Sequence, residues 1–303
     1  MKYSTILAGA ALAATSFVSA QSAEEDIVVL QYALTLEHLE AEFYRGGLAK
    51  YSPHDFKQAD YPAAVPQRLA QIAAQEATHV TALSGILTSL GVEPTKPCTY
   101  DFGYTTLQGF LATASILEAV GVSAYLGKAP LIDDKAYLTA AGAILTVEAR
   151  HQALIQSFQK QDGTPSPFDT PLQGSQVFSL ASPFIKSCPA GNPTLPFKAF
   201  PSLTVNTPNP KIGQRVGFTY PKTNGPVYLH FLNGLNDIAV KADAQGGAVL
   251  PSGTSGYVYV VATNSEAAPN DDNTVAGPAI IVLPNPDAKY KYPKDKRALE
   301  FRA

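Results

Sequence analysis

The sequence predicts an α + β protein with two domains, a four-helix bundle followed by an antiparallel β-sandwich. Within residues 21–165, four stretches carry apolar residues at steps of three and four, the period of a helix face that packs inside a bundle. Residues 166–197 are dense in proline and glycine and predict a linker. From 198 to 285 the apolar residues alternate with a period of two, which is typical of strands with one buried face.

Each predicted helix has an apolar seam that is interrupted near its middle. The seams cover residues 27–48, 69–90, 107–125 and 137–158. The interruption is a single glutamate on the first and third helices and a Glu-x-x-His pair on the second and fourth. Because the seams face the bundle interior, we expect six side chains to converge there: Glu37, Glu76, His79, Glu118, Glu148 and His151.

This set of side chains indicates a metal site. Residues at i and i+3 share one helix face, so both members of a Glu-x-x-His pair point inward. A carboxylate in an apolar seam is costly unless a positive charge lies beside it. Two such pairs, with one glutamate on each of two other helices, form the ligand set of di-iron and di-manganese bundles. The alternative is a bundle that has lost its metal and keeps a buried, hydrogen-bonded carboxylate–histidine network.

The pattern of the first two helices is repeated in the last two. On the first and the third helix, a tyrosine follows the lone glutamate by seven residues, which is two helical turns. Tyr44 and Tyr125 either fill the core or donate a hydrogen bond to a ligand carboxylate, and the sequence leaves both readings open. Glu40 flanks the first seam and is a candidate seventh ligand, whereas Glu42 is expected to face water. The three remaining histidines are expected on the surface or in loops: His38, His54 and His230.

Four phrases in the helical region resemble the ferritin-like superfamily: LTLEHLEAEFYRGGL, QEATHVTAL, ILEAVGVSAYLG and VEARHQALI. Within that superfamily, residues 24–165 are similar to secreted fungal ferritin-like stress proteins of the Rds1 type and to plant desiccation-related proteins. The resemblance implies a ferritin-like four-helix bundle that holds two metal ions, iron or manganese, with the six converging residues as ligands.

The second domain is predicted to be a sandwich of immunoglobulin-like type. Short β-type runs separated by turn residues give six or seven strands within 198–285. The chain has no tryptophan, so the Cys…Trp…Cys core of antibody domains is absent. We recognise neither a Ser-His-Asp set nor a metal-ligand cluster in this region. Residues 286–303 are polar and predict a flexible tail.

The first residues predict export. Residues 1–20 have the charged start, the apolar stretch and the small-residue cleavage site of a signal peptide. We expect no other membrane span and an extracellular protein. Cys98 lies in the connection between the second and third helices, and Cys188 follows the fourth. As the two cysteines of a secreted chain, they are expected to form a disulfide.

The sequence leaves several functions open. One is a di-metal oxidoreductase that acts with dioxygen or peroxide in a stress response. A second is a metal-sequestering stress protein without turnover, and a third is a structural cell-surface protein. A dimer through the bundle and a cell-wall contact through the sandwich are further hypotheses. With a formal net charge of −3 and no basic cluster, nucleic acid is not an expected partner.

Overall fold

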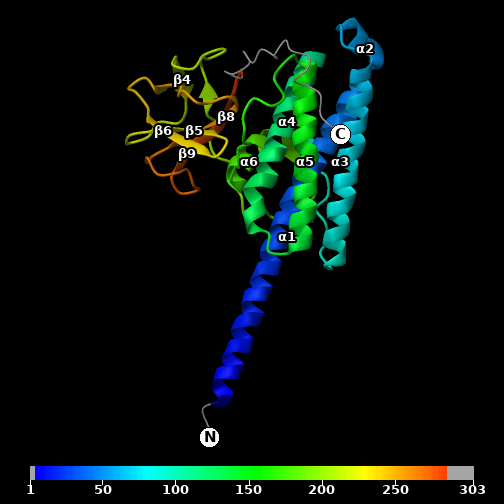
Figure 1. The fold of residues 1–303 in the computed structure, drawn as a ribbon, viewed down its shortest axis with the longest axis vertical. Helices are drawn as coiled ribbons and strands as arrows, with labels where there is room; N and C mark the ends of the chain where they lie inside the picture. Colours follow the sequence, from blue (N-terminus) through cyan, green and yellow to red (C-terminus); the bar gives the residue numbers. More distant parts are fainter. Residues whose placement is uncertain (1–3, 285–303) are drawn as a thin grey trace, which may run out of the picture.

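Four long helices form the helical part of the computed structural model, which describes the backbone of residues 4–284 and the side chains of 23–284 (Figure 1). Their bounds are α1 Ser4–Lys50, α3 Ala64–Ser89, α4 Leu107–Lys128 and α5 Lys135–Phe158. The short α2, Pro53–Gln58, lies between the first two. The bounds agree with the predicted seams, since an apolar stripe of period 3.6 has to be buried on one side.

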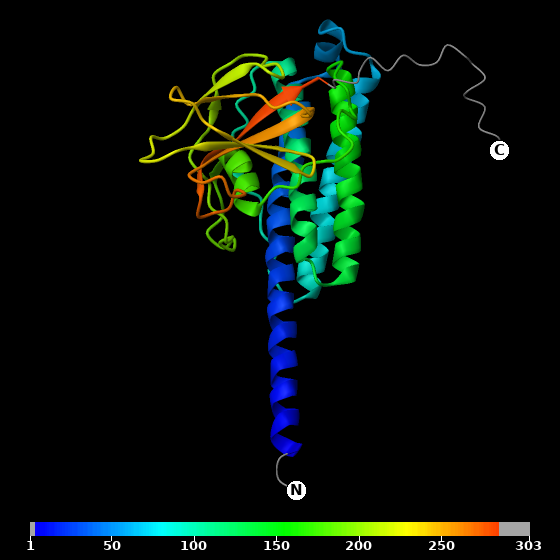
Figure 2. The same ribbon diagram turned by 60° about the vertical axis from the view of Figure 1, so that its left-hand side comes forward.

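The first part of α1 projects beyond the other helices (Figure 2). The predicted signal peptide covers residues 1–20, of which 1–3 lie outside the described residues. The predicted flexible tail, 286–303, lies wholly outside them. Within the described part, one helix is long and apolar enough to cross a membrane, the stretch Leu107–Leu131 that includes α4. Its most apolar window is 72% buried inside the protein, as expected of a core helix.

Local sequence explains where the later helices begin. The Thr106 hydroxyl accepts a hydrogen bond from the amide of Gly109 at the start of α4. The Asp134 carboxylate does the same for the amides of Ala136 and Tyr137 at the start of α5. Such caps satisfy backbone N–H groups that have no partner inside the helix.

The connection between α3 and α4 is fastened along the bundle. The Gln31 side chain on α1 donates to the carbonyl of Glu93 and accepts from the amide of Thr95. Further along, β1 (Thr99–Tyr100) pairs with β2 (Ile185–Ser187) in a small antiparallel sheet. Cys98 and Cys188 form the predicted disulfide beside this sheet, at a separation of 90 positions in sequence. The segment that leaves the bundle is therefore joined to the connection between α3 and α4.

The segment predicted as a linker, 166–197, has structure of its own. It contains α6, Gly174–Ala181, which packs against α4. Leu172 and Val177 from this segment are buried in the core of the bundle. Two 3₁₀ turns also lie outside the long helices, Ala129–Leu131 and Ser182–Phe184. Apolar side chains between the prolines therefore anchor this Pro/Gly-rich segment to the bundle.

The C-terminal region contains two antiparallel sheets. One has the strand order β3–β4–β7 and the other β6–β5–β8–β9. In chain order, the strands are β3 Thr204–Val205, β4 Arg215–Thr219, β5 Tyr228–Asn233, β6 Asn236–Lys241, β7 Gly247–Val249, β8 Gly256–Thr263 and β9 Thr274–Leu283. Apolar residues from both sheets, including Val216, Leu229 and Val260, form a separate core. The antiparallel arrangement agrees with the sequence, whereas the immunoglobulin-like type stays a prediction.

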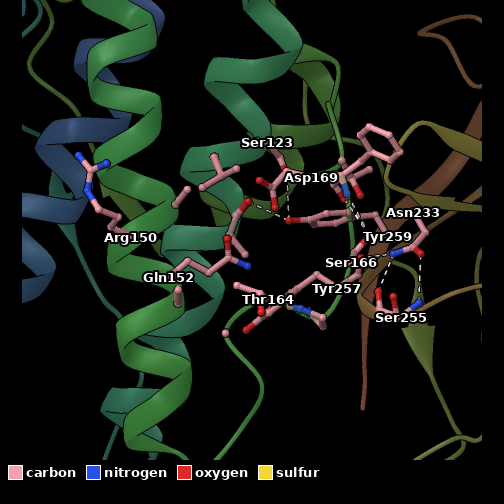
Figure 3. A pocket seen from close by; sticks show the side chains of 18 residues that line it. Ser123, Arg150, Gln152, Thr164, Ser166, Asp169, Asn233, Ser255, Tyr257 and Tyr259 are labelled. Atoms are coloured by element: carbon pink, nitrogen blue, oxygen red, sulfur yellow. Dashed lines mark hydrogen bonds between the residues drawn. The ribbon is translucent and has the colours of Figure 1, made fainter. Parts of the chain in front are cut away.

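β8 joins this region to the helices, since all of its residues are buried. Tyr257 and Tyr259 belong to the core cluster of the bundle. The Tyr257 hydroxyl shares a hydrogen bond of 2.7 Å with Ser115. The Tyr259 hydroxyl accepts from Ser123 and donates to the carbonyl of Ala119 (Figure 3). The sheet therefore covers one side of α4, and the two parts of the chain share a packed, hydrogen-bonded interface.

Candidate metal centre

Six polar side chains from four helices meet in the middle of the bundle. The four glutamates are fully buried, and the two histidines are 8% and 4% exposed. Their donor atoms form two groups, in each of which all atoms lie within 4.8 Å of one another. One group is Glu37, Glu76, His79 and Glu148, and the other is Glu76, Glu118, Glu148 and His151. The structure thus brings all six sequence-predicted residues together, with Glu76 and Glu148 common to both groups.

Each imidazole turns its Nδ1 atom toward carboxylates from more than one helix. His79 Nδ1 lies 3.2 Å from an oxygen of Glu37 and 3.1 Å from an oxygen of Glu76. His151 Nδ1 lies 2.9 Å from the other oxygen of Glu76 and 3.3 Å from Glu118. Nδ1 is thus the nitrogen that either histidine offers to a cation at this position.

Several polar atoms at this centre have no hydrogen-bond partner although they are fully buried. They are Glu76 Oε1, Glu118 Oε2, both carboxylate oxygens of Glu148, and His151 Nδ1. The imidazoles lie within ion-pair distance of these glutamates, at 2.9–3.3 Å, but these approaches lack the geometry of a hydrogen bond. Leaving one buried polar atom unsatisfied costs about 1–3 kcal/mol, so a cluster of them is unusual in a folded core. Two cations would give every one of these atoms a partner. Carboxylate oxygens with one imidazole per group are a donor set that suits iron or manganese. The residues present therefore fit a pair of such ions.

The protonation of the centre reflects its burial. Burial raises the pKa of the Glu37 and Glu148 carboxyl groups well above the ordinary value, because a carboxylate is poorly solvated there. Burial alone would also raise the pKa of Glu76, yet the adjacent imidazoles of His151 and His79 lower it to about 2. Burial disfavours the charged imidazoles, but the glutamates that lie against them raise the pKa of His79 to about 12 and that of His151 to about 10. Metal binding would have to displace the protons held here.

The two tyrosines bind across the bundle. The Tyr44 hydroxyl on α1 donates to Glu118 on α4, and the Tyr125 hydroxyl on α4 donates to Glu37 on α1. In both cases the acceptor is a glutamate of the centre, so the hydrogen-bonded reading is the one observed. The two hydrogen bonds are reciprocal between α1 and α4, which matches the repeated Glu–Tyr pattern in the sequence. Each bond orients a carboxylate that would otherwise rotate.

Gln75 also contacts the centre, and sequence reasoning missed it. Its Oε1 atom accepts a hydrogen bond of 2.8 Å from His151 Nε2. With a proton on Nε2, His151 keeps Nδ1 free for a cation. The signal was weak, since Gln75 only precedes Glu76 and does not lie in an apolar seam.

Glu40 lies at the centre as well, 3% exposed on α1. It adjoins Gly121 of α4, where an added Cβ atom would lie 3.0 Å from Glu40 Oε1 and 3.1 Å from Glu148 Oε2. The missing side chain at Gly121 thus makes room for both carboxylates. Burial, followed by the charge of Glu148, raises the pKa of Glu40 well above its ordinary value. Glu42 lies outside the centre and pairs with Arg45.

The remaining histidines lie outside the centre. His54 is exposed on α2, as expected. His38 is partly buried on α1, where its Nε2 lies 3.0 Å from the carbonyl of Thr95. The expectation for His230 was wrong, because it is fully buried in β5. Its Nδ1 lies 2.7 Å from Asp237.

A cavity of about 290 Å³ lies outside the centre, between the bundle and the sheets. Its wall includes Ser123 of α4, Arg150 of α5, and Tyr257 and Tyr259 of β8 (Figure 3). None of the six converging side chains is among its lining residues. The cavity therefore has no direct contact with these six side chains.

Comparison with known proteins agrees with this geometry. Residues 25–161 match the ferritin-like domain family, and this region contains all six converging side chains. The chain is 28% identical over 239 residues to protein rds1 of Schizosaccharomyces pombe. That alignment covers 79% of this chain and 52% of rds1, so the chain spans about half the length of its relative. The resemblance inferred from the sequence is confirmed, because the helical region matches the ferritin-like domain family and the chain is similar to an Rds1 protein.

Proposed function

We propose that the chain is a secreted di-metal oxidoreductase that binds two iron or manganese ions and acts with dioxygen or peroxide. One observation carries the proposal. Two groups of donor atoms share Glu76 and Glu148, and both oxygens of Glu148 are buried without a partner. A carboxylate shared between two adjacent cation sites is the arrangement that holds a metal pair.

The residues of the centre have distinct roles in this proposal. When bound, the ions supply redox chemistry toward dioxygen or peroxide. The four glutamates of the two groups supply negative charge that balances two divalent cations. Tyr44 and Tyr125 hold Glu118 and Glu37 in place by hydrogen bonds. The apolar core around them excludes water.

Burial favours a small substrate. The four glutamates of the two donor groups are 0% exposed, and the histidines are nearly as well covered. A large organic molecule could reach them only if the helices separated, whereas dioxygen and peroxide are small enough for a packed core. The same burial supports the second candidate function, metal sequestration without turnover, because a closed centre also retains ions.

The proposed setting is extracellular and linked to stress. The Cys98–Cys188 disulfide supports export, because such bonds persist in oxidising compartments. Similarity to secreted fungal stress proteins of the Rds1 type suggests the biological context. Detection of the mature protein in culture medium, starting after residue 20, would test the location.

The metal content of purified protein tests the central part of the proposal. We expect about two iron or manganese ions per chain by elemental analysis. In the double variant Glu76→Ala/Glu148→Ala both groups lose their shared ligands, so bound metal should fall to background. Retention of two ions by this variant would refute the assignment.

A matched control removes two carboxylates elsewhere. Glu42→Ala/Glu93→Ala changes two glutamates that pair with Arg45 and Lys96 at the surface. This control should keep its metal. Consumption of dioxygen or peroxide by the loaded wild-type protein then separates an oxidoreductase from a sequestering protein, which would bind the ions without turnover.

A further inference from the structure

A small apolar pocket lies beside the candidate metal centre, between α1, α4 and α5. Its volume is about 20 Å³, and its wall includes Ala33, Leu36, Ala124, Tyr125 and Ala141. Ala33 precedes Glu37 by one helical turn, so the pocket lies next to the centre along the bundle axis. Apart from three tyrosines and Lys128, every side chain that lines it is a hydrocarbon.

Tyr125 connects this pocket to the centre. Its side chain is part of the wall, and its hydroxyl donates to Glu37 in one of the two donor groups. A molecule in the pocket would therefore lie one side chain away from a glutamate of the centre. Tyr125 is thus the side chain that the pocket and the centre have in common.

The opposite end of the centre is filled instead. Tyr44 occupies the equivalent position there, and its ring packs edge-to-face against Phe43 at 5.3 Å and against Phe110 at 6.4 Å between ring centroids. Tyr44 is 0% exposed and is not among the lining residues of the pocket. Alanines at one end take the place of aromatic rings at the other. The pocket is therefore a property of one end and not of the duplicated fold.

Size and polarity identify the occupant. A cavity needs roughly 10–15 Å³ to hold one water-sized molecule, so this pocket takes a single small one. A buried water needs two to four polar partners, and the wall is almost wholly hydrocarbon. The Lys128 amine lies over the rings of Phe197 and Tyr32, at 4.3 and 5.6 Å from their centroids. An apolar diatomic molecule suits such a space better than water or peroxide.

We propose that this pocket holds dioxygen next to the metal centre and that Tyr125 separates the two. The proposal rests on the oxidoreductase function and names dioxygen, not peroxide, as its small substrate. It predicts that oxygen reaches the centre from the Tyr125 end of the bundle.

Xenon tests the pocket without any metal, because dry apolar cavities bind it. Crystals of the full chain under xenon pressure should show a xenon atom among Ala33, Ala124 and Ala141. An empty pocket under pressure, or an ordered water that xenon does not displace, would overturn the proposal.

A matched pair of variants on α5 tests the route. Ala141→Leu fills the pocket, whereas Ala143→Leu adds the same side chain at an exposed position two residues away. With two ferrous ions per chain as the electron source, Ala141→Leu should consume oxygen at least about tenfold more slowly while it keeps its metal. It should also lose the xenon site, and Ala143→Leu should behave as the wild type. An unchanged rate in Ala141→Leu would overturn the proposed route. Failure of the wild-type protein to bind metal or consume oxygen would instead count against the proposed function, so the two failures are distinguishable.

Discussion

Two buried histidine clusters in this chain differ in how well their polar atoms are satisfied. In the β-region, His230 Nδ1 lies 2.7 Å from Asp237 and its Nε2 lies 3.4 Å from the carbonyl of Ser265. In the bundle, His151 Nδ1 and both oxygens of Glu148 have no hydrogen-bond partner. A satisfied cluster is complete without a ligand and stabilises the fold. An unsatisfied one gains stability when a ligand binds to its free atoms, which marks the bundle cluster as the candidate functional one.

The largest expected difference between the clusters is their response to metal and pH. Raised pKa values at Glu37, Glu148 and both histidines mean that the folded, metal-free protein holds protons that the unfolded chain releases. That stabilisation is complete below the unfolded pKa values and is lost as pH rises toward the folded ones. The lowered pKa of Glu76 acts with the opposite sign, but only between about pH 2 and its ordinary value.

We therefore expect the melting temperature of metal-free protein to fall between about pH 5 and pH 8. Added iron or manganese should restore about 4 kcal/mol at a thousandfold excess over Kd, and more at higher pH because protons compete with the ions. Scanning calorimetry with and without metal measures both effects. A metal-free protein that becomes more stable across this range would contradict the protonation assigned to the centre.

A smaller effect is expected in the β-region. Asp237→Ala leaves the buried His230 nitrogen without its partner and should cost about 1–3 kcal/mol of unfolding free energy. Metal content should not change, because this cluster is complete by itself. Lys241→Ala, on the exposed end of the same strand, is the control and should be nearly neutral. Loss of bound metal in Asp237→Ala would break the distinction between the two clusters.

The smallest effect concerns the hydrogen bonds to the glutamates. Tyr44→Phe keeps the ring that packs against Phe110 but removes the donor to Glu118, so metal affinity should fall about tenfold. Tyr61→Phe, a partly exposed tyrosine that packs on the same core, is the matched control. Metal titration measures the difference. Equal affinity in Tyr44→Phe and wild type would show that the hydroxyl only satisfies the core.

The helices and the centre could be predicted because their signals are local. A carboxylate in the middle of a 3.6-period seam, as at Glu118, has only the bundle interior to face. His230 shows the limit of such reasoning. Its place in an alternating strand does not reveal that both faces of β5 are covered, here by the segment around Ser265. The burial of α6 escaped prediction for the same reason, since Val177 finds its partners only in the folded bundle.

Gln75 and the apolar pocket depend on more distant geometry. Gln75 meets His151 across 76 residues of sequence, and no local pattern indicates that contact. The pocket exists because alanines from three helices lie at one level, which a single helix pattern cannot show. Contacts that combine residues from several elements therefore could be identified only from the structure. The position of a side chain on one helix face could be predicted from the sequence.

Anomalous diffraction tests the central claim most directly. Crystals of the native protein, measured on both sides of the iron and manganese absorption edges, should show two peaks at mid-bundle. We predict that Glu76 and Glu148 lie between the peaks, with Glu37 and His79 on one side and Glu118 and His151 on the other. Metal-replete crystals with no peak among these residues, or with metal bound only elsewhere on the chain, would contradict the account.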